Sequence, residues 1–153
     1  MNYWVLTISN DNLRVTRKLG LTLQGFSLAH KKKVERMTPG DRLLYYVTTP
    51  SSFAATAAIT SKYTEDTSPI WKPGPKGDIC PLRVQIRPEV VLEEAVYLDA
   101  RQIGPRLDYV RRWTPERWYL AFQAQQLHML SRKDFDLIES EMRRVARQQP
   151  RVA

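Results

Sequence analysis

The sequence predicts an α+β fold, in which strands form one sheet or barrel and helices pack around it. Two apolar runs, Tyr3–Ile8 and Leu43–Val47, are each apolar on both faces, as is typical of strands at the centre of a sheet. A third run, Leu82–Arg87, alternates apolar with polar residues, as a half-buried strand does. The clearest helix follows Ser131 and places its apolar residues on one face: Phe135, Ile138, Met142 and Val145.

Length and composition indicate one domain over residues 1–147, followed by a disordered tail at residues 148–153. A chain of this size buries about 68–70% of its unfolded surface, so it needs no disulfide or metal to fold. The single Cys80 cannot form an internal disulfide, which fits a reducing cytosol, so we expect a cytoplasmic protein. No apolar run approaches the ~20 residues that span a bilayer. We therefore expect a monomer with no membrane partner.

The charge balance is strongly basic, with a formal net charge of +8 and an isoelectric point near 9.8. Such a balance favours an anionic partner, of which nucleic acid is the simplest. The alternative is a solvated basic surface with no specific partner, and charge alone does not separate the two.

The first strand stops at a polar dipeptide, Ser9-Asn10. Asn10 can accept from the free N–H groups of a helix over Asp11–Lys18, and Gly20 is suited to end that helix. The functional alternative is that Ser9 and Asn10 line a pocket at the end of the strand.

The next segments predict a surface helix, a turn and a pair of strands. Ser27 suits the N-cap of a helix over Leu28–Met37, and Thr38–Asp41 is a turn that leads into the strand Arg42–Thr49. The run Phe53–Thr60 is rich in alanine and could be helical by propensity. We predict a strand, because threonine, isoleucine and phenylalanine flank it and the preceding strand needs an antiparallel partner.

A long segment broken by proline and glycine, Tyr63–Pro81, predicts an ordered loop of the kind that often carries function. It contains Trp71 beside Lys72, and this tryptophan is either exposed for binding or covers the core. After the loop, Pro88 weakens the strand that starts at Leu82, so any continuation at Val90–Leu92 requires a bulge.

The last part of the chain predicts short helices and a closing strand. The helices are expected at Leu98–Ile103, at Leu107–Arg111 and after Thr114, and the strand at Leu120–Gln125. Ser131-Arg132-Lys133-Asp134 resembles a capping box at the start of the last helix.

The chemistry-bearing residues do not predict catalysis. Neither His30 nor His128 has carboxylates or cysteines at ligand spacing, so no metal and no cofactor is expected. Cys80 has no base beside it and is expected to be a small core residue. Glu93-Glu94 is expected to be a solvated strand end.

Aromatic and basic residues instead occur together, which favours nucleic-acid binding, since aromatic rings stack on bases and cations hold phosphates. The tryptophans Trp71 and Trp118 have the basic residues Lys72 and Arg117 as their neighbours in sequence, and Lys31-Lys32-Lys33 is a separate basic run. The alternatives are tryptophans that pack in the core and lysines on a solvated helix face.

At several points the sequence resembles EVE domains, a branch of the PUA-like fold. The resemblance runs from Asn2 to about Arg144 and rests on the order and spacing of several short motifs: Tyr3-Trp4-Val5-Leu6 with Ser9-Asn10, Val34-Glu35-Arg36-Met37 with Pro39-Gly40-Asp41, Leu43–Val47, Asp66-Thr67-Ser68, Tyr97–Ile103 with Pro105, and Arg117-Trp118. The family implies a curved β-barrel of about five to six strands with surrounding helices. It also implies a pocket for a flipped-out and often modified base, like that of the related YTH domains.

The resemblance implies roles for particular residues. Ser9 and Asn10 would hydrogen-bond the base edge, Trp118 and Trp71 would stack on the base, and Gly25 would let the backbone come close to it. Lys31, Lys32, Lys33 and Arg117 would contact phosphates.

Two departures from the family pattern affect the expected pocket. Gln24 stands where EVE domains usually carry a tryptophan before a glycine, here Gly25, so Phe26 or Trp71 would have to replace that wall. Tyr119-Leu120-Ala121 is bulkier than the small glycines that usually follow Trp118, which would narrow the pocket.

The sequence therefore predicts a nucleic-acid binding module that recognises a modified, for example methylated, base and is not an enzyme. One alternative is an enzyme or small-molecule binder that uses the same pocket, which a titratable pair inside the pocket would favour. Another is a protein-interaction module, which a broad exposed apolar patch away from the pocket would favour.

Overall fold

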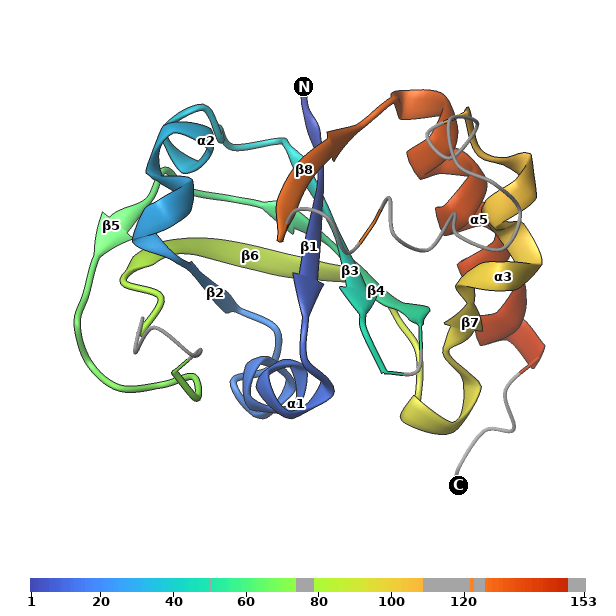
Figure 1. Ribbon diagram of the computed structural model, residues 1–153, viewed down its shortest axis with the longest axis horizontal. Coiled ribbons are helices and arrows are strands. Elements are labelled where there is room, and N and C mark those ends of the chain that lie inside the picture. Colours follow the sequence, from blue (N-terminus) through green and yellow to red (C-terminus); the bar gives the residue numbers. More distant parts are fainter. Residues whose placement is uncertain (50, 74–78, 109–121, 123–125, 149–153) are drawn as a thin grey trace.

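The fold was analysed in a computed structural model, which describes residues 1–49, 51–73, 79–108, 122 and 126–148. The strands join in one mixed sheet that curls into a half-barrel, in the order β2-β6-β4-β3-β1-β8 (Figure 1). Two further short strands lie beside this path, with β5 on β6 and β7 on β4. The strands are β1 (Tyr3–Ile8), β2 (Leu23–Phe26), β3 (Arg42–Val47), β4 (Ser52–Ile59), β5 (Thr64–Glu65), β6 (Leu82–Val91), β7 (Leu98–Asp99) and β8 (Leu127–Leu130).

The first strand lies inside the sheet, as its apolar faces predict. β1 pairs in parallel with β3, placing Trp4 beside Leu43, and antiparallel with β8, placing Tyr3 beside Leu130. Trp4 has no exposed surface at all. A strand buried on both faces cannot shift its register without moving a whole set of side chains to the wrong face, so β1 fixes the register of its neighbours.

The alanine-rich run is a strand, β4, and every one of its residues is buried. β4 pairs antiparallel with β3 on one side and with β6 on the other. The register between β4 and β6 shifts between Thr56 and Ala57, where Pro88 and Val90 lie opposite. The predicted bulge is therefore present, and it lets β6 accommodate a residue that has no backbone N–H to donate.

The helices lie on opposite sides of this sheet (Figure 1). The helix after β1 starts one residue earlier than expected, because Ser9 rather than Asn10 is its N-cap and accepts from the backbone N–H of Asn12. The predicted helix Leu28–Met37 is divided into a 3₁₀ turn and a short α-helix. The helical elements are α1 (Asn10–Lys18), η1 (Leu28–His30), α2 (Lys31–Glu35), η2 (Glu94–Val96), α3 (Ala100–Ile103), η3 (Gly104–Arg106) and α5 (Arg132–Gln148).

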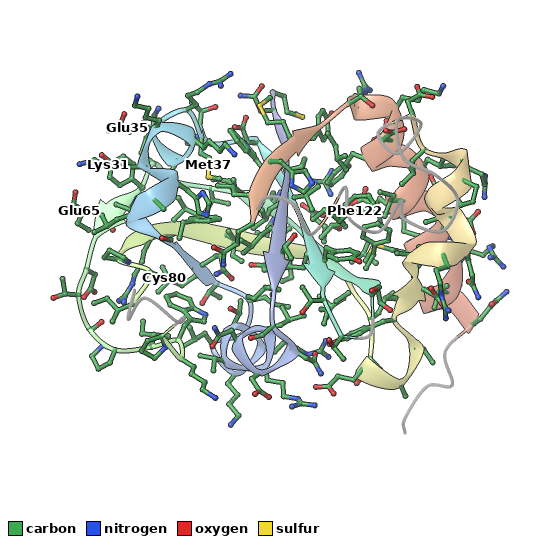
Figure 2. All side chains as sticks on the ribbon, in the orientation of Figure 1. Lys31, Glu35, Met37, Glu65, Cys80 and Phe122 are labelled. Atoms are coloured by element: carbon green, nitrogen blue, oxygen red, sulfur yellow. The ribbon has the colours of Figure 1, made fainter. Side chains whose placement is uncertain are left out.

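Two apolar cores result, one on each side of the central strands. On the side of α1 and α2, Trp4 and Leu6 of β1 pack with Leu13 and Met37. On the side of α3 and α5, Val5 of β1 belongs to a cluster that contains Phe135, Ile138 and Met142. Figure 2 shows Met37 turned toward the sheet, whereas Lys31 and Glu35 point away from it. β1 therefore contributes side chains to both cores.

Several predictions from the sequence need correction. The closing strand is β8 at Leu127–Leu130; of the predicted strand Leu120–Gln125, only Phe122 is described, and it lies in the second core. The segment Leu98–Ile103 divides into β7 and α3. The last helix begins as predicted, with the Ser131 hydroxyl accepting from the Asp134 backbone at 3.1 Å. The Asp134 carboxylate, however, does not complete a capping box but accepts from the backbone N–H of Asp108 at 3.0 Å.

The predictions that fall on residues 109–121 lie outside the described residues, including the helix expected after Thr114. Among the helices that the structure describes, none is long and apolar enough to cross a membrane.

Candidate functional site

A pocket opens where β1, α1, β2 and the long loop meet. It measures about 330 Å³ when its open mouth is included, and the free volume inside it is only about 30 Å³. β1 contributes apolar side chains, β2 contributes its last residues, and the loop contributes an aromatic ring. The lining residues are Leu6, Ile8, Asn12, Gln24, Gly25, Phe26, Ser27, His30, Trp71, Cys80 and Gln126.

Trp71 lies inside this pocket rather than on the surface, and only 3% of it is exposed. Its indole N–H donates to the hydroxyl of Thr16 at 2.8 Å. The backbone of the next residue is also held, since Lys72 N donates to Asn12 Oδ1 at 2.9 Å and Asn12 Nδ2 donates to Lys72 O at 3.2 Å. The ring is therefore fixed from α1, at two residues that lie one helical turn apart.

Gly25 allows the loop to approach β2 closely. A methyl group added at Gly25 would lie 2.5 Å from the Trp71 ring and 2.5 Å from the carbonyl oxygen of Cys80. Real carbon atoms do not approach so closely, so no other residue fits here without movement of the loop. The resemblance implies that Gly25 lets backbone come near a ligand; in the structure, the group that comes near is Trp71.

Gln24 lines the pocket, although it is only 2% exposed. Its carboxamide oxygen accepts from the Tyr45 hydroxyl at 2.9 Å and from the Thr16 hydroxyl at 3.0 Å. Its amide nitrogen donates to the carbonyl of Gly25 at 2.8 Å. The polar atoms of Gln24 are therefore bonded to the protein itself.

Arg83 of β6 contacts several residues of the long loop, a role that the sequence does not reveal. The alternation of apolar and polar residues along β6 predicts that Arg83 faces solvent, yet it is only 2% exposed. The guanidinium lies 5.3 Å from the centroid of the Trp71 ring and donates to the Ser68 hydroxyl at 2.7 Å, to the Ser68 carbonyl and to the Cys80 carbonyl at 3.3 Å. Asp66, whose pKa is lowered mainly by hydrogen bonds from Ser68, lies 3.4 Å away.

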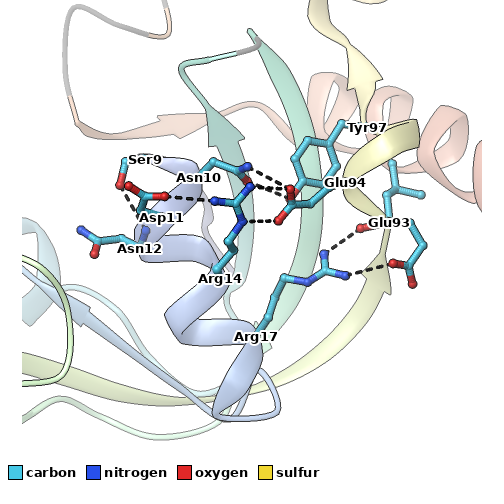
Figure 3. A network of polar contacts seen from close by, with 10 residues as sticks. Ser9, Asn10, Asp11, Asn12, Arg14, Arg17, Glu93, Glu94 and Tyr97 are labelled. Carbon is cyan, nitrogen blue, oxygen red and sulfur yellow. Dashed lines mark hydrogen bonds and ion pairs between the residues drawn. The ribbon is translucent and has the colours of Figure 1, made fainter.

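Ser9 and Asn10 do not line the pocket. Ser9 caps α1, and Asn10 takes part in a surface network on the other side of that helix (Figure 3). In this network Asn10 donates to Glu94 at 3.2 Å and accepts from the Tyr97 hydroxyl at 3.1 Å. Glu94 is thus not a simply solvated strand end. Hydrogen bonds from Arg14, the nearer at 2.5 Å, lower its pKa to about 2, so it stays ionised at neutral pH.

The basic run lies next to the pocket mouth. Lys31, Lys32 and Lys33 line a shallow surface groove along η1 and α2, and His30 lines both this groove and the pocket. Lys31 and Lys32 are exposed, whereas Lys33 donates to the carbonyl of Leu127 at 2.5 Å. The Lys31 ammonium lies 3.7 Å from the Glu65 carboxylate, a distance at which exposed charges interact weakly.

The remaining predicted site residues differ in position. Phe26 lines the pocket but is only 1% exposed. Trp118 and Arg117 lie outside the described residues. Cys80 is half-buried at the pocket wall, with a backbone φ of +54°, rather than in the core (Figure 2).

The described lining of the pocket is partly apolar and partly polar. None of the described lining residues is a carboxylate. No group of three or more potential metal ligands occurs among the residues that the structure describes. The described lining thus combines aromatic rings with amide groups.

Comparison with known proteins gives relatives of similar length. A UPF0310 protein of Pyrococcus abyssi is 24% identical over 148 residues, which cover 92% of this chain and 99% of that protein. A UPF0310 protein of Pyrococcus horikoshii is 26% identical over 149 residues, which cover 91% of this chain and 97% of that protein.

Solved structures of YTH domains share the fold. The crystal structure of the Mmi1 YTH domain superposes with a TM-score of 0.69 at 8% identity, over 97% of this chain and all of that one. The YTH domain of the Zygosaccharomyces rouxii MRB1 protein, solved in complex with N6-methyladenosine RNA, gives a TM-score of 0.66 at 15% identity, over 92% of this chain and 86% of that one. The half-barrel is therefore of the PUA-like type.

A family model described as the EVE domain matches residues 2–139, which is most of the chain, including every element that forms the pocket. The chain therefore belongs to the EVE domain family.

Proposed function

We propose that this protein binds single-stranded nucleic acid and receives one unstacked base, modified by methylation, in the pocket between β1, β2 and Trp71. The main observation behind the proposal is that a pocket lined by aromatic rings lies next to a groove lined by lysines. His30 lines both of them. A base taken out of its stack needs apolar and aromatic surroundings, and its flanking phosphates need cations outside the pocket.

The relatives support this assignment. The YTH domain of MRB1 was solved with N6-methyladenosine RNA, and a Mmi1 YTH domain was solved in complex with RNA. The fold likeness extends over more than nine-tenths of this chain in both comparisons. We propose that the aromatic contacts come from Trp71 and Phe26, with Trp118 as a further ring.

We propose a binding role rather than an enzymatic one. An enzyme acting on the same nucleobase would need a nucleophile with a proton-accepting side chain beside it, or a pair of groups that act as general acid and general base. Cys80 and His30 are among the described lining residues, and none of those residues is a carboxylate. The amide of Gln126 lies 3.2 Å from His30 Nε2 and occupies that nitrogen.

The phosphate contacts predict a steep dependence of affinity on salt. Neutralising phosphates releases counterions, so the logarithm of the affinity should fall linearly with the logarithm of the salt concentration. The slope should be about −0.7 for each phosphate of a single strand that the protein contacts. Replacing Lys31, Lys32 and Lys33 by alanine should weaken binding and flatten this dependence, equally for modified and plain oligonucleotides. Fluorescence anisotropy at several salt concentrations would measure both effects.

The matched control removes the same charge from α5. Arg132, Lys133 and Arg144 are exposed on that helix, on the other side of the sheet, and their triple alanine variant has the same net charge as the α2 variant. An equal loss of affinity in both variants would mean that the overall charge, and not the groove, attracts nucleic acid. An affinity that does not change with salt would exclude phosphate contacts altogether.

Occupancy of the pocket predicts that a modified base protects Cys80 from alkylation. Cys80 is the single cysteine and lines the pocket, so a maleimide reagent reports on this wall alone. We expect a short RNA or DNA strand with one N6-methyladenine to slow the reaction several-fold, and the plain strand to slow it less. Mass spectrometry of the intact protein over time gives the rate.

A Cys80→Ala variant should bind the modified strand with nearly unchanged affinity and should take up no reagent. If strands bind tightly but leave the alkylation rate of the natural protein unchanged, the base does not enter this pocket. If the RNA strand protects and the DNA strand does not, the ligand is RNA, and the reverse result assigns DNA.

A further inference from the structure

The aromatic rings of the pocket have almost no surface open to a ligand. Trp71 is 3% exposed and Phe26 is 1% exposed. Trp71 touches Gly25 on one side and has the Arg83 guanidinium over its ring. A base could stack on Trp71 only after the indole leaves this position. The free volume inside the pocket, about 30 Å³, is enough for only about two water molecules and leads to the same conclusion.

The bonds that hold Trp71 in this position come from α1. The indole N–H donates to Thr16, and the Asn12 carboxamide forms a reciprocal pair of hydrogen bonds with the Lys72 backbone. None of these residues carries a charge in these contacts, so the attachment should not depend on salt.

The direction of the hydrogen bonds behind Trp71 is fixed by the backbone of Gly25. Its carbonyl can only accept, so the amide nitrogen of Gln24 faces it, and Gln24 Oε1 faces Tyr45 and accepts from the Tyr45 hydroxyl. The Thr16 hydroxyl donates to the same oxygen at 3.0 Å, closer than the Asn12 carbonyl at 3.4 Å, while it accepts from Trp71. A hydroxyl placed between a donor and an acceptor in this way satisfies both, and the loss of that hydroxyl would leave the buried indole N–H without its acceptor.

We infer that the pocket is held closed by its own Trp71, and that Thr16 and Asn12 set the balance between this closed state and an open, base-binding state. The inference rests on the proposed function, because it assigns to the base the position that Trp71 now fills. Thr16 and Asn12 act as positioning residues. When only a minor open state binds, the apparent dissociation constant equals the intrinsic one divided by the open fraction. Weakening the attachment should therefore tighten binding.

The first test needs no ligand. In ¹⁵N-labelled protein, Thr16→Val removes the hydroxyl and keeps the shape, whereas Thr16→Ser keeps the hydroxyl. We expect hydrogen exchange of the Trp71 indole and the Lys72 amide to become roughly three- to tenfold faster in the valine variant, the range that one net hydrogen bond produces. The serine variant should exchange at nearly the natural rate. Equal exchange rates in the natural protein and the valine variant would overturn the inference.

The second test adds a short RNA, and in parallel a DNA, that carries one N6-methyladenine. Thr16→Val should lower its apparent dissociation constant by the same factor by which exchange accelerates. Weaker binding together with faster exchange would overturn the inference, because Trp71 would then be a wall that the base needs in its present place. If neither strand binds any of the proteins, the proposed function fails, whereas the exchange rates still decide whether Thr16 holds Trp71.

Asn12→Ala provides a second variant, in case the substitution of buried Thr16 prevents folding. Asn12 is partly exposed, and its side chain bonds only to the Lys72 backbone among the described residues, so its loss should spare the core. We expect faster exchange of the Lys72 amide and tighter binding in this variant too. Faster exchange together with weaker binding would overturn the inference.

Discussion

Leu44→Asp should abolish cooperative folding. Leu44 lies in β3 between β1 and β4, has no exposed surface and belongs to the core on the side of α5. An aspartate here would be an unpaired charge in an apolar interior, and the effective cost of burying an ion is several kcal/mol. A domain of this size is stable by only about 5–15 kcal/mol, so the substitution should remove most or all of its stability.

Urea unfolding followed by circular dichroism measures this effect. The matched control is Gln85→Asp, which introduces the same side chain at an exposed position of β6 and should change stability by less than about 0.5 kcal/mol. A soluble Leu44→Asp protein with a natural unfolding midpoint would show that β3 does not lie inside the sheet.

Asp41→Asn should destabilise the protein by about 2–4 kcal/mol, although the two side chains have the same shape. The Asp41 carboxylate is buried and accepts from the Trp4 indole at 3.1 Å, from the Asn2 backbone at 3.0 Å, and from the Thr38 backbone and hydroxyl at 3.2 and 3.3 Å. Both oxygens are acceptors, so an amide group in place of either would face donors. Each buried donor that loses its acceptor costs about 1–3 kcal/mol.

A double-mutant cycle with Trp4→Phe separates this cause from others. Without the indole N–H, part of the penalty of Asp41→Asn should disappear, because one of the orphaned donors is no longer present. Asp136→Asn, at an exposed carboxylate of α5, is the control for the change in net charge. Fully additive effects of Trp4→Phe and Asp41→Asn would contradict the assigned role of the Trp4–Asp41 hydrogen bond.

The strands that the sequence predicts are those whose pattern is local. β1 and β3 are apolar on both faces, and the bulge at Pro88 follows from the missing N–H of proline. The sequence does not predict the closing strand at the position of β8. The four residues of β8, with Met129 exposed, show no clear alternation of apolar and polar side chains. A function for the long loop stays a prediction, and its tryptophan is covered through a contact with Thr16, which lies 55 positions away in the chain.

The residues of the site were predictable only in part. Gly25, Phe26 and Trp71 line one pocket, and their roles toward a base stay predictions. Thr16, Asn12 and Arg83 were not predicted, because each acts through a contact between elements distant in sequence, and their residue types alone have no functional signature. The burial of Arg83 follows from the loop folding back over β6, which the alternation of β6 cannot reveal.

The position of β1 also has a consequence for the order in which the protein is made. Its two partners arrive at different times, since β3 begins at Arg42 whereas β8 begins at Leu127. On the ribosome, β1 can therefore pair on one side long before its other edge is covered, and an uncovered apolar edge invites pairing with other chains. Until Leu130 has left the exit tunnel, the growing chain presents that edge. This topology therefore requires that nascent chains be kept apart until β8 is made. A stall in synthesis before β8 would carry the greatest risk of aggregation.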